Sequence, residues 1–223
     1  MTAVGIVGGL GVVATVHYYE NIVAACKARG VVPDLSIVHA DVDHGQTLIR
    51  AGRLDALAQY IVGFVEKLKR AGAELAVLPA VTPHICIKEL TPLLPIPLIN
   101  IVEALAAELE KRRIKRVALF GTVYTVQGNL YGQLEGVEIV KPQPDEIDFI
   151  GQAYQRILDD KTRPDDADGF RRIAAAMQQR DGVETILLAG TDLAALFTEE
   201  TAGFPCLDVG RVHIAAIVDK LCR

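Results

Sequence analysis

Two kinds of hydrophobic run alternate along the chain, and their alternation predicts an α/β fold. Short, continuously apolar runs indicate buried strands, whereas longer runs with apolar residues at helical spacing indicate helices. Unbroken apolar strands are typical of parallel sheets that helices cover on both faces. In the first half, the predicted strands lie at 3–9, 35–40, 75–79 and 95–100, and the predicted helices at 15–30, 54–72 and 101–113.

The second half of the chain repeats this order. VGIVG at 4–8 resembles VALFG at 117–121, ELAVLPAVT at 74–82 resembles ETILLAGTD at 184–192, and IPLIN at 96–100 resembles FPCLD at 204–208. The offsets of 113, 110 and 108 residues are nearly constant, which predicts an internal duplication rather than a solenoid. We therefore expect two pseudo-symmetric lobes, each a parallel sheet flanked by helices, with a ligand cleft between them.

The expected N-terminal lobe comprises residues 1–100 and 209–223, and the expected C-terminal lobe comprises residues 101–208. Inside the second lobe, the segments 141–148 and 159–169 are rich in Pro, Asp and Gly, so we predict that they are loops.

Ligands of open parallel sheets bind beyond the carboxyl ends of the strands. Polar or Gly-rich turns follow four predicted strand ends, at 8–9, 80–84, 121–125 and 190–192. Backbone N–H groups at a glycine turn before a helix suit an anion, and hydroxyl groups suit a small carboxylate. The predicted binding residues on these turns are Gly8, Gly9, Thr82, Thr122, Thr125 and Thr191. The turn at 8–11 lacks the glycine spacing of nucleotide-binding loops, and a tight turn without a ligand is the alternative.

Four side chains near these turns could transfer a proton: His44, His84, Tyr124 and Asp192. His84 follows a strand end, where it could act as a base or could instead cap and pack the next helix. His44 is expected on the loop after the second strand, where it could titrate near neutral pH. Its neighbours Asp41 and Asp43 do not complete a recognised metal-ligand spacing, so no metal and no cofactor is predicted.

The composition and charge of the chain argue against several classes of binding partner. The formal charge is −5, and the densest basic run, at 111–116, lies at a predicted helix end, so nucleic acid and anionic membranes are not expected partners. No apolar run reaches the roughly 18–20 residues of a membrane helix, and no signal peptide is evident. The four cysteines show no metal spacing. We expect a cytoplasmic protein with reduced thiols.

These segments resemble the aspartate/glutamate racemase superfamily, and most closely its aspartate racemase branch. The resemblance covers nearly the whole chain and is carried by VGIVGGLGVVATVHYYENIV, AGAELAVLPAVTPH, VALFGTVYTVQGNLY, ETILLAGTDLAAL and PCLDVGRVHIAA. It implies two α/β lobes, a homodimer, an amino-acid substrate, and no pyridoxal phosphate or metal. It also implies an isomerase in which one cysteine removes the α-proton and a second cysteine returns a proton to the opposite face.

The chain departs from this pattern at both cysteine positions. The first turn reads Ala80-Val81-Thr82, without the family's cysteine and asparagine, and the second has Gly190 in place of cysteine. Asp192 stands where the family has Glu. The resemblance also implies an Arg and a Lys for the substrate's side-chain carboxylate, and Gln46 and Leu158 occupy the best matching positions. Gln46 and Val81 complete the set of predicted binding residues.

We therefore expect a racemase-superfamily protein that binds a small carboxylate or amino acid with non-standard, isomerase-like or lyase-like chemistry. A non-catalytic carboxylate-binding homologue is the first alternative. A conventional cysteine-dependent aspartate racemase is the second.

Overall fold

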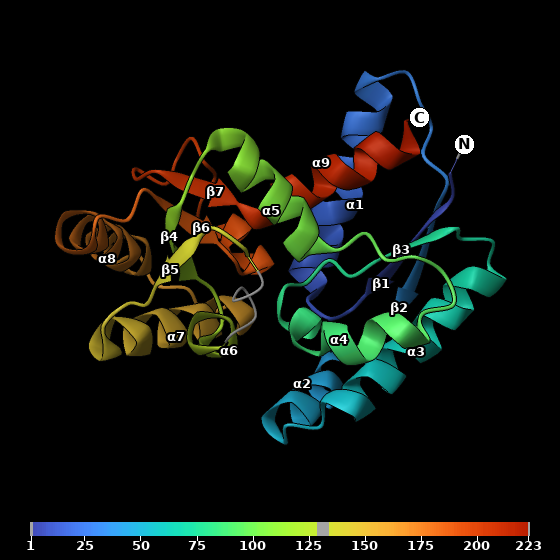
Figure 1. The fold of residues 1–223 in the computed structure, drawn as a ribbon, viewed down its shortest axis with the longest axis horizontal. Coiled ribbons are helices and arrows are strands. Elements are labelled where there is room, and N and C mark those ends of the chain that lie inside the picture. The colour runs from blue at the N-terminus through green and yellow to red at the C-terminus, as the bar shows by residue number, and fades with distance from the viewer. Residues whose placement is uncertain (1, 129–133, 223) are drawn as a thin grey trace. The chain divides into compact units, whose positions relative to one another are not determined.

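The computed structural model describes residues 2–128 and 134–222. The chain divides into two compact units, Met1–Ile101 with His213–Arg223 (unit 1) and Val102–Val212 (unit 2). The boundaries thus lie one and four residues beyond those expected from the sequence. Each unit contains one parallel sheet with helices packed against it, so the predicted α/β fold is confirmed (Figure 1).

The sheet of unit 1 has the strand order β2-β1-β3, and both pairings are parallel. Its strands are β1 (Val4–Gly8), β2 (Leu35–His39) and β3 (Leu75–Val77). The fourth strand predicted at 95–100 is wrong, because this segment forms only one isolated bridge, between Ala76 and Leu98. Pro95 and Pro97 have no backbone N–H group, so the segment cannot continue a ladder.

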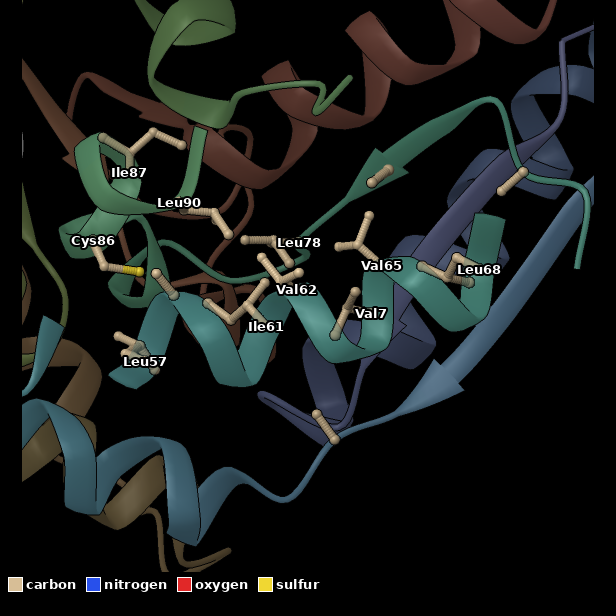
Figure 2. Close-up of a cluster of buried hydrophobic side chains, with 14 residues drawn as sticks. Val7, Leu57, Ile61, Val62, Val65, Leu68, Leu78, Cys86, Ile87 and Leu90 are labelled. Carbon is tan, nitrogen blue, oxygen red and sulfur yellow. The ribbon is translucent and has the colours of Figure 1, made fainter. Parts of the chain in front are cut away.

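Helices cover both faces of this sheet. On one face lie α1 (Val12–Ala28) and the part of α9 (Val209–Leu221) that belongs to unit 1, whose side chains pack with Val4, Ile6 and Val77. On the other face, the apolar side of α3 (Leu54–Arg70) lies in one cluster with Val7, Leu78 and Cys86, as Figure 2 shows. The α3 residues in this cluster include Leu57, Ile61, Val62, Val65 and Leu68. The remaining elements of unit 1 are α2 (Val42–Arg50), α4 (Ile87–Leu90) and the 3-10 helices η1 (Thr82–Cys86) and η2 (Thr91–Leu93).

The sheet of unit 2 has the order β5-β4-β6-β7, again with parallel pairings. Its strands are β4 (Arg116–Phe120), β5 (Glu138–Val140), β6 (Thr185–Leu188) and β7 (Cys206–Asp208). Its helices are α5 (Ile101–Arg112), α6 (Val123–Gln127), α7 (Pro144–Leu158), α8 (Asp166–Asp181) and the 3-10 helix η3 (Thr191–Ala195). The last three residues of the segment VALFGTVYTVQGNLY, 129–131, lie outside the described residues.

Both loops predicted in unit 2 are wrong, because each segment contains the start of a helix. Helix α7 begins at Pro144, a residue whose fixed φ suits the first helical turn, and the carboxylate of Glu146 accepts the N–H of Gln143 at 2.7 Å. Helix α8 begins at Asp166, whose carboxylate accepts the N–H of Arg163 at 2.8 Å. The polar residues therefore open helices rather than extend loops.

Within residues 2–128 and 134–222, none of the helices combines the length and the apolar character needed to cross a membrane.

Candidate functional site

The turn after β1 is shaped by close contact with the end of β2. Gly9 has a φ of +83°, and a Cβ atom there would stand 2.2 Å from the carbonyl oxygen of Ala40. Only glycine fits such a position. The N–H of Gly9 donates to Oγ1 of Thr15 at 3.1 Å, so this amide already has a partner. The contact with Ala40 explains Gly9 without a ligand, and anion binding by Gly8 and Gly9 stays a prediction.

The structure places His44 and Gln46 on α2, not on a loop. Asp41 caps this helix, since its Oδ1 accepts the N–H of Asp43 at 2.9 Å and that of His44 at 3.3 Å. His44 is exposed, and the centroid of its ring lies 4.7 Å from that of Tyr60. Oε1 of Gln46 accepts from Nη2 of Arg50 at 2.7 Å within the same helix. Sequence reasoning missed α2 because it is short and mainly polar.

The turn after β3 contains Ala80, Val81 and Thr82. The side chains of Ala80 and Val81 are buried, whereas Thr82 is partly exposed and begins η1. His84 stabilises this turn through two hydrogen bonds. Its Nδ1–H donates to the carbonyl oxygen of Ala80 at 2.9 Å, and its backbone N–H donates to the carbonyl oxygen of Val81 at 3.0 Å. The turn thus presents two apolar side chains and a hydroxyl group.

Burial changes the expected role of His84. Its ring is fully buried, and burial lowers its pKa to about 4. Burial likewise lowers the pKa of His213 to about 3, and the proximity of His84 adds to that effect. His213 accepts the hydroxyl of Tyr18 at Nδ1 and donates from Nε2 to the carbonyl oxygen of Ile99 at 2.8 Å. These contacts favour the alternative in which His84 packs and holds the turn, rather than its predicted role as a base.

In unit 2, the turn after β4 brings together two hydroxyl groups. Thr122 caps α6 by accepting the N–H of Thr125 at 3.2 Å, and the two Oγ1 atoms lie 3.0 Å apart. Tyr124 follows on the exposed side of the same short helix. A Cβ atom on Gly121 would stand 3.1 Å from the carbonyl carbon and oxygen of Ala189, so the ends of β4 and β6 are in direct contact.

The turn after β6 contacts a residue that sequence reasoning missed, Tyr154 of α7. Asp192 is buried, and its Oδ2 accepts the hydroxyl of Tyr154, on α7, at 2.9 Å. The ring of Tyr154 lies against Gly190, next to the buried Thr191. One signal in the sequence could have indicated such a contact. Gly190 lies at a strand end and has no side chain, whereas its counterpart in the first repeat, Ala80, has one. No pattern indicated which residue fills the space.

None of the four thiols occupies position 80 or 190, although Cys86 ends η1, where its thiol donates to the carbonyl oxygen of Pro83 at 3.2 Å. Cys86 and Cys26 are fully buried, Cys206 begins β7, and Cys222 follows α9. Burial raises the pKa of Cys86 to about 12 and the pKa values of Cys26 and Cys206 to about 11. Protonated thiols are poor bases. Among the described residues, no group of three or more His, Cys, Asp or Glu side chains could hold a metal ion.

Comparison with known families gives a match over residues 7–217, to a family described as Asp/Glu/hydantoin racemase. The chain belongs to this family. The superfamily predicted from the sequence is thereby confirmed. A curated relative, the broad specificity amino-acid racemase RacX of Bacillus subtilis, is 24% identical over 214 residues, which are 92% of this chain and 92% of the relative.

Two solved structures support the fold of the Asp/Glu/hydantoin racemase family for this chain. An aspartate racemase homologue from Pyrococcus horikoshii has a TM-score of 0.82 at 24% identity, with complete coverage of both chains. The aspartate racemase of Picrophilus torridus has a TM-score of 0.79 at 21% identity, covering 99% of this chain and 94% of the other. The expected two-lobed, aspartate racemase-like architecture is therefore confirmed.

Proposed function

We propose that this member of the Asp/Glu/hydantoin racemase family binds a small carboxylate or amino acid and acts on it without a pair of thiols. One observation carries the proposal. The strand-end turns keep hydroxyl groups at Thr82, Thr122, Thr125 and Thr191, whereas Ala80 and Gly190 offer no side chain that can take up or release a proton.

The state of the cysteines supports the same conclusion. A thiol works as a base only when it can become a thiolate near neutral pH. Burial raises the pKa of each of Cys26, Cys86 and Cys206 to about 11 or above, which opposes that. This disfavours the alternative of a conventional cysteine-dependent aspartate racemase.

The retained polar groups are suited to a carboxylate. The Thr122 and Thr125 hydroxyls lie side by side at the end of β4, next to the end of β6 that carries Thr191. Hydrogen-bond donors aimed at a carboxylate stabilise the charge that develops on it when the neighbouring carbon loses a proton. The proposed reaction class is therefore proton transfer at a carbon next to a carboxylate, with an isomerase-like or lyase-like outcome.

The first experiment measures binding. D- and L-amino acids, small dicarboxylates, and keto and hydroxy acids are screened by thermal shift. A ligand that binds only the native state at 100 times its Kd stabilises it by about 2.7 kcal/mol. For a chain of this size that raises the Tm by roughly 5–10 °C. Failure of every acid to shift the Tm would contradict the proposal.

Thr122→Ala and Thr198→Ala form a matched pair of variants. Each threonine accepts a backbone N–H three residues further on at 3.2 Å and contacts a second threonine hydroxyl, but Thr198 lies outside the four strand-end turns. We expect Thr122→Ala to reduce the ligand-induced shift and Thr198→Ala to preserve it. Equal shifts in the two variants would remove Thr122 from the binding site.

The second experiment separates catalysis from binding. Any acid that binds is incubated with the protein in deuterated water, and loss of the α-proton is followed by NMR. Binding without exchange or turnover would identify the non-catalytic homologue, which the apolar Ala80 and the missing side chain at 190 also favour. The predicted homodimer and cytoplasmic location stay predictions, and light scattering on the purified protein measures the former.

A further inference from the structure

The side-chain position of Gly190 is occupied by another residue. A Cβ atom on Gly190 would stand 2.2 Å from Cε2 of Tyr154 and 2.6 Å from both its Cζ and its hydroxyl oxygen. The phenol oxygen of Tyr154 is thus at the place that a short side chain on residue 190 would fill. The backbone of Gly190, with a φ of −120°, would accept any residue, so contact with the ring explains the glycine.

The phenol is held there by a defined partner. Its O–H donates to Oδ2 of Asp192 at 2.9 Å, and both side chains are at least nine-tenths buried. Tyr154 comes from α7, which packs against η3, the element that carries Asp192. Two residues 38 positions apart in sequence therefore meet at the carboxyl end of β6.

A phenol bonded to a carboxylate forms a proton-transfer pair. The carboxylate can take the phenol proton while the phenol oxygen takes a proton from a third atom. The low polarity of a buried site strengthens the hydrogen bond between the phenol and the carboxylate. A phenylalanine would fill the same space, so packing alone does not require the hydroxyl group.

We propose that Tyr154 is the catalytic acid–base residue of unit 2 and that Asp192 is its proton partner. This rests on the function proposed above and adds the residue and the route of the proton. The substrate is an acid that carries a C–H bond next to its carboxylate. The phenol oxygen takes the α-proton as its own proton passes to Asp192. The electron pair of the broken C–H bond moves into the substrate carboxylate. The proton that the phenol oxygen has taken up exchanges with water, and the reverse steps then return a solvent proton to the same carbon as Asp192 gives its proton back to the phenol oxygen.

This route has a stereochemical consequence. One acid–base group returns the proton to the face of the carbon from which it took it, whereas two groups on opposite faces produce inversion. We therefore expect exchange of the α-hydrogen with retained configuration.

The experiment measures α-deuterium incorporation and chirality in deuterated water for an acid shown by thermal shift to bind. Tyr154→Phe keeps the ring and removes the hydroxyl group, and is expected to lower the exchange rate by about 10²-fold or more. Tyr18→Phe is the matched control, since it also removes a buried phenol hydroxyl with a polar partner, here Nδ1 of His213 at 3.1 Å. It should change the exchange rate by less than about twofold. Asp192→Asn should slow exchange as Tyr154→Phe does.

Gly190→Ala provides a second variant that displaces the phenol without removing its hydroxyl group, and it too should lower exchange. Unchanged exchange in Tyr154→Phe or in Gly190→Ala would overturn the proposal. Binding without exchange in the wild type, or inversion at the rate of exchange, would overturn it while leaving the binding function intact. If no acid binds, the proposed function itself fails, and the role of Tyr154 fails with it.

Discussion

Adding one methyl group at Gly190 tests whether Tyr154 occupies the side-chain position of that residue. In Gly190→Ala the new Cβ atom would overlap the ring at 2.2 Å, far inside van der Waals contact. Tyr154 is only 4% exposed and is bonded to Asp192, so the ring cannot move aside without losing packing and a hydrogen bond.

The expected cost follows from these contacts. Forcing an extra carbon into a packed site typically costs about 1–3 kcal/mol. Replacing Gly by Ala at a permitted φ also lowers the conformational entropy of the unfolded chain, which stabilises the folded protein by about 0.4–1 kcal/mol. The net destabilisation of Gly190→Ala should therefore lie between about 0 and about 2.6 kcal/mol, which lowers the Tm of a chain of this length by up to roughly 10 °C.

A double-mutant cycle isolates the overlap. In a Tyr154→Ala background the space is open, so Gly190→Ala should be neutral or slightly stabilising. In a Tyr154→Phe background Cε2 and Cζ are still present, so the cost should match that in the wild type. Calorimetry on the six proteins (wild type, the three single variants and the two double variants) gives a coupling of about 1–3 kcal/mol between Gly190→Ala and Tyr154→Ala if the ring fills the site. Additivity within about 0.5 kcal/mol would refute the assignment.

Three further predictions concern stability and redox state. The Sγ atoms of Cys26 and Cys222 lie 3.7 Å apart, so glutathione disulfide should convert them into an intrachain disulfide, detected as a loss of two hydrogens in intact mass and prevented by Cys222→Ser. The reaction should accelerate with pH, because burial raises the pKa of Cys26 to about 11. The hydrogen bond from Arg156 holds the pKa of the buried Asp166 below its ordinary value. The ionised carboxylate therefore stabilises the folded protein fully above about pH 4, and this contribution to the free energy of unfolding is lost as the pH falls through the lower native pKa. Asp166→Asn should lower the free energy of unfolding by ~3 kcal/mol near pH 7, as measured by denaturant titration. It should also weaken the dependence of that free energy on pH below about pH 4. Burial lowers the pKa of His84 to about 4, so stability should fall by about 3 kcal/mol between pH 6.5 and 4, and His84→Asn should reduce that slope in a Tm–pH series.

The main strands of both sheets were predictable because their apolar runs are continuous. Helix α3 was equally plain, since its apolar face, which Figure 2 shows against Val7 and Leu78, recurs at helical spacing. The errors in secondary structure arose at residue types that occur in more than one kind of local structure. Pro144 and Asp166 were interpreted as loop residues, although each opens a helix. The apolar segment around Pro97 was interpreted as a strand, although proline limits it to one bridge.

The candidate site was predictable only as far as local sequence determines it. The duplication located the strand-end turns, because each turn follows its strand directly. The pairing of Tyr154 with Asp192 depends on how α7 packs against η3, and no local pattern encodes that packing. His84 shows the converse: its position near a strand end indicated a base, whereas its burial and its bond to Ala80 depend on the folded unit.

The two positions that the family resemblance assigns to cysteine differ physically in this chain. Ala80 keeps a buried Cβ atom in a turn that His84 holds in place. At Gly190 the ring of Tyr154 fills the Cβ position, and its hydroxyl group is bonded to Asp192. The second turn is instead built around a ring from another helix, so we infer a divergent site in unit 2 rather than a racemase that has merely lost its thiols.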